Sequence, residues 1–378
     1  MSMRNRALAG LVLSLSAVLA QNSPLDPRTY FKIDLPKDSP VTLVSADMGE
    51  SQASARGSAM IIDLRSSLSL RNSGSQRIRG VTLLVAAQEV TAGGKASVSV
   101  PSLNVPPGET FAVRIDLRLL RPLLPAGPLV QVNLDGVLFE DLSFYGPNLL
   151  NSRRSMTVWE MEARRDRRYF KSILAAQGEE GLRKTMLESL ARQAERPRAD
   201  VQVARGGRAT NLDAERSMQF AFLRLPDSPI EPLAGVAQIA GNEARAPSLE
   251  VRNRSGRPVR YFEIGWILRD AEGREFLAGS VPASDPDLKL GPGERSRVRQ
   301  ETSLRVSGAP GRPLSIAGMT GFVSQVEFAD GSVWIPSRLA LRDSRLSRLL
   351  SPSPEEQRLT EIYRKKGLAA VAAELNKF

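Results

Sequence analysis

Two similar stretches of sequence decide the fold: Ser67–Gly74 reads SLSLRNSG, and Ser248–Gly256 reads SLEVRNRSG. In each stretch apolar residues alternate with polar ones, a period of two that predicts a half-buried β-strand. The Asn, Ser and Gly that follow predict a turn. Further pairs recur in the same order: LPKDSP at 35–40 with LPDSP at 225–229, and LNVPPGE at 103–109 with LKLGPGE at 288–294. We interpret the chain as a tandem duplication.

Strand and turn signals extend outward from both stretches. In the second copy, Tyr261–Leu268 is apolar on both faces, as in a central strand, and Asp270–Gly273 and Asp330–Gly331 predict hairpin turns. The first copy has matching apolar segments at 78–86, 111–117 and 130–145. Short strands separated by turn residues at this spacing predict an antiparallel β-sandwich.

These motifs resemble the bacterial immunoglobulin-like sandwich modules of exported proteins. The shared features are a strand ending in Arg-Asn, a Ser-Gly turn, a long central strand and a Pro-Gly-Glu turn, and they cover roughly residues 60–145 and 245–337. The resemblance implies a fold and an extracytoplasmic setting, and it carries no catalytic residues across. The cysteine pair of antibody domains is absent from the sequence.

The predicted fold class is mainly β with short helical appendages: two tandem antiparallel β-sandwich (Ig-like) domains, each followed by a small helical pair. The predicted boundaries are a signal peptide at 1–20, the first sandwich at 28–150, the first helical pair at 155–196, the second sandwich at 217–343 and the second helical pair at 353–378.

The first twenty residues have the features of a Sec-type signal peptide. Arg4 and Arg6 precede the uncharged run Ala7–Leu19, and Val18-Leu19-Ala20 supplies small residues for cleavage near Ala20. We expect a periplasmic or secreted bacterial protein without a transmembrane segment after signal removal. An uncleaved membrane anchor is the alternative, although the run is short for a bilayer.

Two capping boxes mark the expected starts of the helical pairs. They are Thr157–Glu160 and Ser353–Glu356, the second with a proline at the first helical position. Gln177–Gly181 is expected to break the first pair, and Gly367 to end the first helix of the second pair. We expect each pair to pack on its own sandwich. The alternative is that one pair docks a partner or a second copy.

The composition excludes much catalytic chemistry. The chain has no cysteine and no histidine, so it has no thiolate metal site, no imidazole base and no Ser-His-Asp triad. Phosphate-binding glycine loops and nucleophile elbows are absent as well. Asp285–Asp287 and Asp270 with Glu272 are acids in predicted turns, where a calcium ion is an alternative reading. We expect no enzyme activity, no cofactor and no metal.

Basic residues give the chain a net charge of +11 at pH 7. They concentrate on one predicted helix and on neighbouring strands and turns of the second sandwich. These positions are candidates for an anion-binding surface; the other interpretation is a solvated helix face and a protected sheet edge. No aromatic residues interleave with them to stack bases, so we expect no nucleic acid. The candidates are Arg164, Arg165, Arg167, Arg168, Arg252, Arg254, Arg295, Arg297 and Arg299.

The sequence therefore predicts an exported, non-enzymatic binding or scaffolding protein of the cell envelope. Its mechanism is expected to be protein–protein docking with another envelope protein, through an exposed strand edge or a basic face. The alternative is an adaptor that binds anionic glycan or phosphate-bearing envelope polymers through its arginine-rich surfaces.

Overall fold

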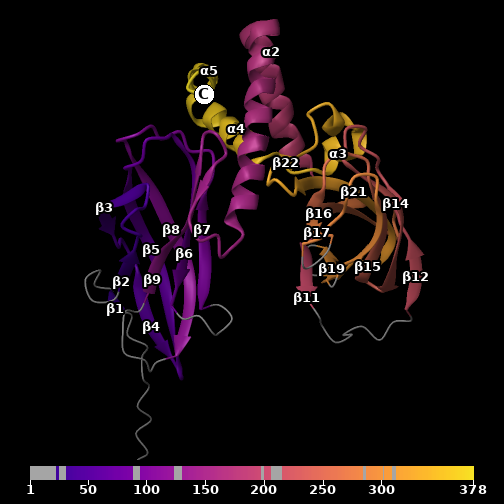
Figure 1. Ribbon diagram of the computed structural model, residues 1–378, viewed down its shortest axis with the longest axis horizontal. Helices are drawn as coiled ribbons and strands as arrows, with labels where there is room; N and C mark the ends of the chain where they lie inside the picture. Colours follow the sequence, from indigo (N-terminus) through magenta and orange to yellow (C-terminus); the bar gives the residue numbers. More distant parts are fainter. Residues whose placement is uncertain are drawn as a thin grey trace, which may run out of the picture. The chain divides into compact units, whose positions relative to one another are not determined.

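The computed structural model describes residues 23–24, 31–87, 94–122, 130–196, 200–205, 215–283, 287–300, 302–308 and 312–378. The predicted signal peptide and Asp285 lie outside these ranges. The chain is mainly β, with several sheets and few helices, as Figure 1 shows. It divides into two units: most of residues 1–150 form the first, and residues 151–378 with 101–104 and 138–144 form the second.

The first unit contains two sheets. In the first sheet the order is β1-β4-β5-β3, with β8 along the other side of β5; in the second it is β10-β9-β6-β7, with β2 parallel to β9. The strands are β1 (Ser23–Pro24), β2 (Phe31–Asp34), β3 (Val41–Asp47), β4 (Gln52–Arg56), β5 (Ala59–Asn72), β6 (Ile78–Ala86), β7 (Lys95–Val100), β8 (Thr110–Pro122), β9 (Val130–Phe139) and β10 (Phe144–Tyr145).

Asn72 ends β5 and joins it to the neighbouring turns. Its buried side-chain amide donates to the carbonyls of Gln76 and Val105 at 2.9 and 3.0 Å, and its Oδ1 accepts from the backbone of Gly74. A buried amide is stable only when its donors and acceptors are satisfied. The predicted Arg-Asn turn is therefore a polar clamp that fixes the end of the strand.

The second unit also contains two sheets. One has the order β11-β19-β15-β14-β12, with β18 on β15 and β20 on β19; the other is β13-β21-β16-β17, with β22 on β21. The strands are β11 (Asp200–Arg205), β12 (Arg216–Gln219), β13 (Ala221–Phe222), β14 (Ile230–Ala240), β15 (Glu243–Asn253), β16 (Val259–Asp270), β17 (Glu275–Pro282), β18 (Arg295–Arg299), β19 (Thr302–Gly308), β20 (Arg312–Pro313), β21 (Ile316–Phe328) and β22 (Val333–Trp334).

One apolar core joins the two sheets of the second unit. Leu249 and Val251 of β15 meet Ile264 and Trp266 of β16 in it, and all four are fully buried. Alternation of buried and exposed positions along β15 places these side chains on one face, as the sequence predicted. The second unit therefore has two sheets packed on one shared core.

The strand plan of the first unit recurs in the second. Asn253 repeats the clamp of Asn72, since its amide donates to the carbonyls of Arg257 and Leu290 and its Oδ1 accepts from the backbone of Ser255. In both units an early strand also pairs in parallel with a late one, β2 with β9 and β13 with β21. The motifs that repeat in the sequence thus hold equivalent positions in the two sheet systems.

A helix of 44 residues, α2 (Ser152–Glu195), opens the helical part of the second unit. It bends at Gly178, whose φ of 67° is outside the helical range, so the expected break is confirmed. The prediction that a capping box at Thr157–Glu160 starts the helix is wrong. The helix begins five residues earlier, after Asn151 in a left-handed conformation, and both box residues are buried within it.

The remaining helices follow β22: η1 (Ala340–Arg342), α3 (Ser344–Leu349), α4 (Pro354–Lys366) and α5 (Leu368–Leu375). The N-cap at Ser353 is confirmed, because its hydroxyl accepts from the backbone of Glu356 at 3.1 Å. The reciprocal half of the predicted capping box does not form, since the Glu356 carboxylate binds Arg338, Arg192 and Ser189. Gly367 ends α4 with a φ of 79°, as expected. No local sequence pattern indicated η1 or α3.

The two helical pairs pack against each other, which corrects the expectation that each would cover its own sandwich. Phe170, Leu182 and Met186 of α2 share a fully buried cluster with Leu359 of α4 and with α5. Each pair is too short to bury an apolar face alone, and a neighbouring pair supplies the missing surface. Within the described residues, no helix combines the length and the apolar character needed to cross a bilayer.

Candidate functional site

The predicted arginine cluster on α2 is built into the protein rather than spread over its surface. Arg167 is 4% exposed and donates to Glu160 at 3.0 Å and to Glu355 at 3.3 Å. Arg165 binds Asp166 and the carbonyl of Pro336. For Arg167 the prediction of a surface position is wrong, because a buried guanidinium needs buried carboxylates as partners.

Arg164 and Arg168 complete this cluster. Arg164 donates to Glu160 at 2.8 Å and also reaches the carbonyl of Glu140. Arg168 is exposed and donates to the carbonyl of Arg164. We refer to Arg164, Arg165 and Arg167 as the helix arginines; all three have carboxylate partners.

Asp166 is the centre of the ion network on this face of α2. Its carboxylate is fully buried and accepts from Arg165 at 3.0 Å, from Arg338 at 3.1 Å and from the Ser353 hydroxyl at 2.6 Å. The donors come from α2, from the segment after β22 and from the N-cap of α4. The network therefore connects the helices to the second sandwich.

Glu356 of α4 extends the same network. It accepts from Arg338 at 2.7 Å, from Arg192 at 3.0 Å and from the Ser189 hydroxyl at 2.6 Å. Burial opposes ionisation of Glu356, but the hydrogen bond and charge of Arg338 outweigh it and hold the pKa of this carboxyl below its ordinary value. With these partners the residue is structural and carries a fixed negative charge.

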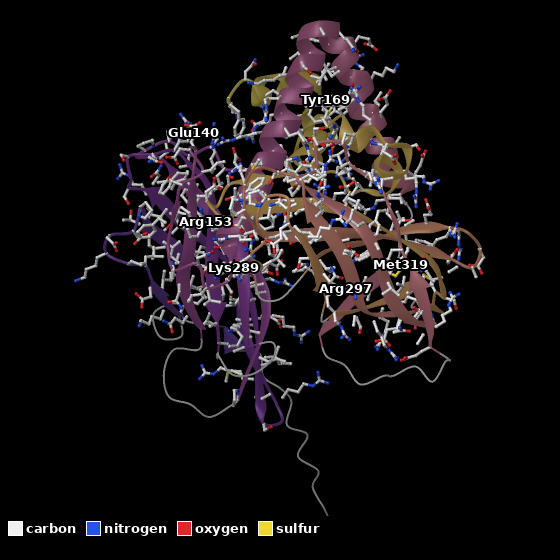
Figure 2. The ribbon with its side chains drawn as sticks, turned by 45° about the vertical axis from the view of Figure 1, so that its right-hand side comes forward. Glu140, Arg153, Tyr169, Lys289, Arg297 and Met319 are labelled. Carbon is white, nitrogen blue, oxygen red and sulfur yellow. The ribbon has the colours of Figure 1, made fainter. Side chains whose placement is uncertain are left out.

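The second arginine cluster differs in that its side chains remain free. Arg252 of β15 and Arg295, Arg297 and Arg299 of β18 are exposed, and among the described residues they make no side-chain hydrogen bond or ion pair. We refer to these four as the strand arginines. Arg254, in the turn after β15, is exposed as well. Figure 2 shows Arg297 on the sandwich, well away from Tyr169 of α2.

The register of β15 and β18 brings like charges together. Arg252 lies directly opposite Arg295, and Glu250 lies opposite Arg297. The side chains of Arg295, Arg297 and Arg299 alternate with Ser296 and Val298, so they project from one face. Directly opposed like charges on a sheet are destabilising, and a bound anion would relieve that repulsion.

The outer edge of β18 is also free. β18 pairs with β15, and within the described ranges no other strand joins it. The backbone N–H of Gln300 donates to the carbonyl of Pro247 at 2.8 Å. Hydrogen-bonded and non-hydrogen-bonded pairs alternate along an antiparallel ladder, so this bond shows which residues of β18 face β15 with their backbone groups. It follows that Arg295, Arg297 and Arg299 direct their backbone N–H and C=O groups away from β15, toward the open edge.

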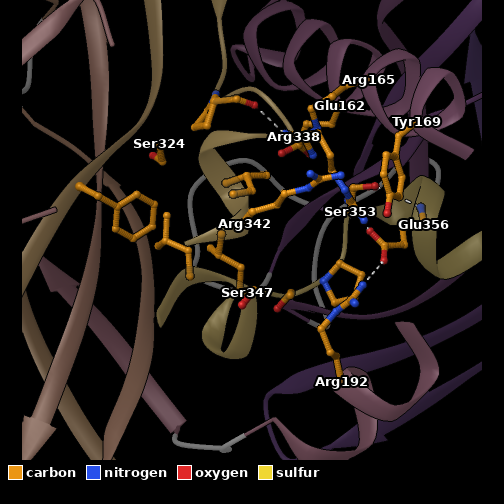
Figure 3. A pocket seen from close by; sticks show the side chains of 17 residues that line it. Glu162, Arg165, Tyr169, Arg192, Ser324, Arg338, Arg342, Ser347, Ser353 and Glu356 are labelled. Carbon is orange, nitrogen blue, oxygen red and sulfur yellow. Dashed lines mark hydrogen bonds and ion pairs between the residues drawn. The ribbon is translucent and has the colours of Figure 1, made fainter. Parts of the chain in front are cut away.

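A pocket of about 200 Å³ lies between α2, β21 and the segment that contains η1 and α3. Figure 3 shows Glu162, Tyr169 and Arg338 on one side of it and Ser324 on the other, with Arg342 extending between them. Its size is below that of most drug-sized ligand sites, so it suits a small molecule.

Glu162 is the unusual residue of this pocket. It is half-buried, and no described residue makes a hydrogen bond or an ion pair with its carboxyl group. Burial raises the pKa of Glu162 to about 7; Arg165 opposes this effect, and the charges of Asp166 and Glu263 add to it. Glu162 therefore changes its charge near neutral pH.

Glu263 of β16 receives hydroxyl hydrogen bonds. Tyr261 donates to it at 2.5 Å and Ser280 at 2.7 Å, and Ser280 in turn contacts Ser324 at the pocket wall. Burial first, and then the charge of Glu263, raise the pKa of Tyr261. Sequence reasoning missed both Glu162 and Glu263, because nothing in the local pattern separates them from surface acids.

The structure gives no support for the calcium alternative at the residues it describes. Asp287 binds Arg154 at 2.9 Å, and Asp270 binds Arg274 at 2.8 Å, so both acids are engaged with guanidinium groups. Within the described part of the chain, no group of three or more potential metal ligands comes together.

Comparison with known proteins gives no family. No protein-family model matches the chain, and no curated protein matches it either. Among solved structures, a protein named pT26-6p is 8% identical with a TM-score of 0.18, and the alignment covers 89% of this chain and 72% of that one. A β-glucosidase from Kluyveromyces marxianus is 7% identical with a TM-score of 0.15, over 71% and 45% of the respective chains. Similarities this low carry no argument about fold or function.

Proposed function

We propose that this chain is an exported, non-enzymatic binding protein of the cell envelope that docks an extended, acidic segment of a partner protein along β18. One observation carries the proposal: among the described residues Arg295, Arg297 and Arg299 are unpaired, and they lie on a strand, β18, that no described strand joins at its outer edge. An added strand would take up the free backbone groups of Arg295, Arg297 and Arg299. Acidic side chains on that strand would offset the opposed charges of Arg252 and Arg295.

The proposed architecture is a tandem pair of immunoglobulin-like sandwich modules, followed by helices that brace the second module. The matching clamps at Asn72 and Asn253, and the parallel pairing of an early and a late strand in each unit, support a duplication. Export is supported by the composition of residues 1–20.

The experiment uses the full chain without residues 1–20 and a fluorescent heptapeptide of alternating Glu and Val. Binding is measured by anisotropy at 0.05 and 0.5 M salt, alongside inorganic polyphosphate as a polyanion without a strand-forming backbone. We expect the peptide to bind and to lose most of its affinity at high salt.

Two variants separate the edge from the charge. Replacing Arg295, Arg297 and Arg299 by Gln removes charge and keeps the edge. Arg297→Pro blocks the edge at a position whose N–H makes no ladder bond, where proline is tolerated. Peptide binding is expected to fall at least tenfold in both variants, whereas Arg168→Gln, an exposed arginine of α2, leaves it unchanged.

The polyanion distinguishes the glycan alternative. If Arg297→Pro leaves peptide binding intact and polyphosphate binds as tightly as the peptide, the site recognises only negative charge. The strand-docking proposal is then wrong. Thermal melts of both variants establish that the second unit remains folded.

A further inference from the structure

The pocket beside α2 has one apolar side. Phe322 is 2% exposed and Leu346 is fully buried, and both belong to a small apolar cluster that Leu341 and Leu350 flank. These side chains line the pocket together with Pro336. The wall can take a branched hydrocarbon group of a few carbon atoms, because the side chains that form it are apolar.

Most charged groups around the pocket are already matched. Arg165 binds Asp166, Arg338 binds Asp166 and Glu356, and Arg192 binds Glu356. These groups have little capacity left for a ligand's charge.

Two lining groups of opposite sign remain. Glu162 and Arg342 make no side-chain hydrogen bond or ion pair with any described residue. Arg342 comes from η1 and extends into the pocket, while Glu162 comes from α2, as Figure 3 shows. Glu162 is half-buried, so its unpaired negative charge favours a positively charged ligand group. Arg342 is exposed, and its guanidinium is free to pair with a negatively charged group.

We propose that this pocket binds a small zwitterion with an apolar substituent, of the class of the branched aliphatic α-amino acids. The ligand's ammonium group would pair with Glu162 and its carboxylate with Arg342, while its side chain would lie against Phe322 and Leu346. A simple amine would leave Arg342 unpaired, and a simple carboxylate would leave Glu162 unpaired. This site is separate from the edge of β18 and does not depend on the docking proposed there.

The pocket predicts proton release on binding. Glu162 faces Arg165, Asp166 and Tyr169 on its own helix, Glu263 on β16, and Arg338 and Glu356 on the segments that pack against α2. In the free protein its pKa is about 7, and an ammonium group beside it would lower that value. Binding below neutral pH therefore expels a proton, and affinity rises as the pH increases from 6 to 8.

The test is calorimetric titration of the full chain without residues 1–20. The ligands are L-leucine, isopentylamine and 4-methylpentanoate, which share a carbon skeleton and differ in charge. We expect leucine to bind most tightly, with proton uptake by the buffer at pH 6 and little at pH 8. Glu162→Gln and Arg342→Gln should each weaken leucine binding about tenfold to hundredfold.

The controls use exposed residues away from the pocket. Glu188 and Arg183 are both exposed residues of α2. The variants Glu188→Gln and Arg183→Gln should bind leucine as tightly as the parent protein does. Equal binding of all three ligands, no binding of leucine, or unchanged affinity in Glu162→Gln would each overturn the proposal. Heptapeptide binding at β18 should be the same in all four variants, so failure at one site is distinguishable from failure at the other.

Discussion

The helix arginines and the strand arginines are similar in sequence and opposite in environment. Both groups are runs of closely spaced guanidinium groups in the second unit. The helix arginines contact Glu160, Asp166 and Glu355, whereas the strand arginines contact no described carboxylate. The difference shows that the acids which the tertiary fold places nearby decide the role of a run of arginines. With buried carboxylates beside them the arginines form internal ion pairs, and without them they stay free to bind a ligand.

Long-range partners explain the different environments. Glu355 and Glu356 follow the second capping box, and the fold places them beside α2. The neighbours of β18 are set by the register with β15, which offers Arg252 and Glu250. The acids beside α2 neutralise the helix arginines, whereas β15 offers β18 one arginine and one carboxylate that forms no ion pair with it among the described residues.

The largest expected effect follows from removing the central acid of the helix network. Asp166→Ala leaves Arg165 without its carboxylate partner and Arg338 with Glu356 alone, so we expect a loss of about 3–5 kcal/mol in the free energy of unfolding of the second unit. Urea denaturation followed by tryptophan fluorescence measures it. Arg297→Gln on β18 should change stability by less than about 0.5 kcal/mol. Equal effects of the two substitutions would remove the distinction between the clusters.

An intermediate effect on stability is expected from Glu162, which is half-buried and has no ion-pair partner among the described residues. Its pKa is raised to about 7 in the folded state from an ordinary value near 4.5. The unfolded state therefore loses its proton first, and stability falls as pH rises from about 4.5 to 7, by at most about 1.4 kcal/mol per pH unit. Glu162→Gln should remove this decline, so its stability advantage over the parent grows across that range and is constant above it.

Thermal or urea unfolding at pH 5, 6, 7 and 8 checks this sign. Glu188→Gln, exposed on the same helix, should follow the parent at every pH. A variant that loses stability relative to the parent as pH rises would mean that the ionised carboxyl of Glu162 has a favourable partner.

The smallest expected effect concerns the strand arginines alone. Arg252→Glu places an acid opposite Arg295 and should raise stability by about 0.2–1 kcal/mol. Arg254→Glu makes the same charge change in the adjacent turn and should have less effect. The first substitution should also weaken heptapeptide binding. If both variants are equally stable, the opposed arginines do not repel measurably.

Local signals in the sequence predicted the sheets well. The Arg-Asn turns at Asn72 and Asn253, the hairpin at Asp270–Gly273 and the cap at Ser353 depend on residues within a few positions of one another. Such features are fixed by backbone geometry and short-range hydrogen bonds, so they can be predicted from the residue types. The box at Thr157–Glu160 failed because residues that suit a cap can also lie within a helix.

The candidate sites were predicted unevenly for the same reason. Exposure of Arg295, Arg297 and Arg299 follows from strand alternation, which the sequence contains. The burial of Arg167 and the isolation of Glu162 depend on which segments pack against α2, and no periodicity specifies that. The packing of the two helical pairs on each other was not predicted for the same reason, because it depends on contacts between distant segments.

The long separation within the ion network has a consequence for biosynthesis. Asp166 meets Ser353 across 187 positions, and Arg167 meets Glu355 across 188. At about 5–20 residues per second, α2 is made on the order of 10–40 s before those partners. During that interval its future interior, with Phe170 and Met186, has no α4 or α5 to cover it. Assembly of the second unit therefore cannot finish before the last segment has been synthesised, and the apolar face of α2 stays uncovered by α4 and α5 until then.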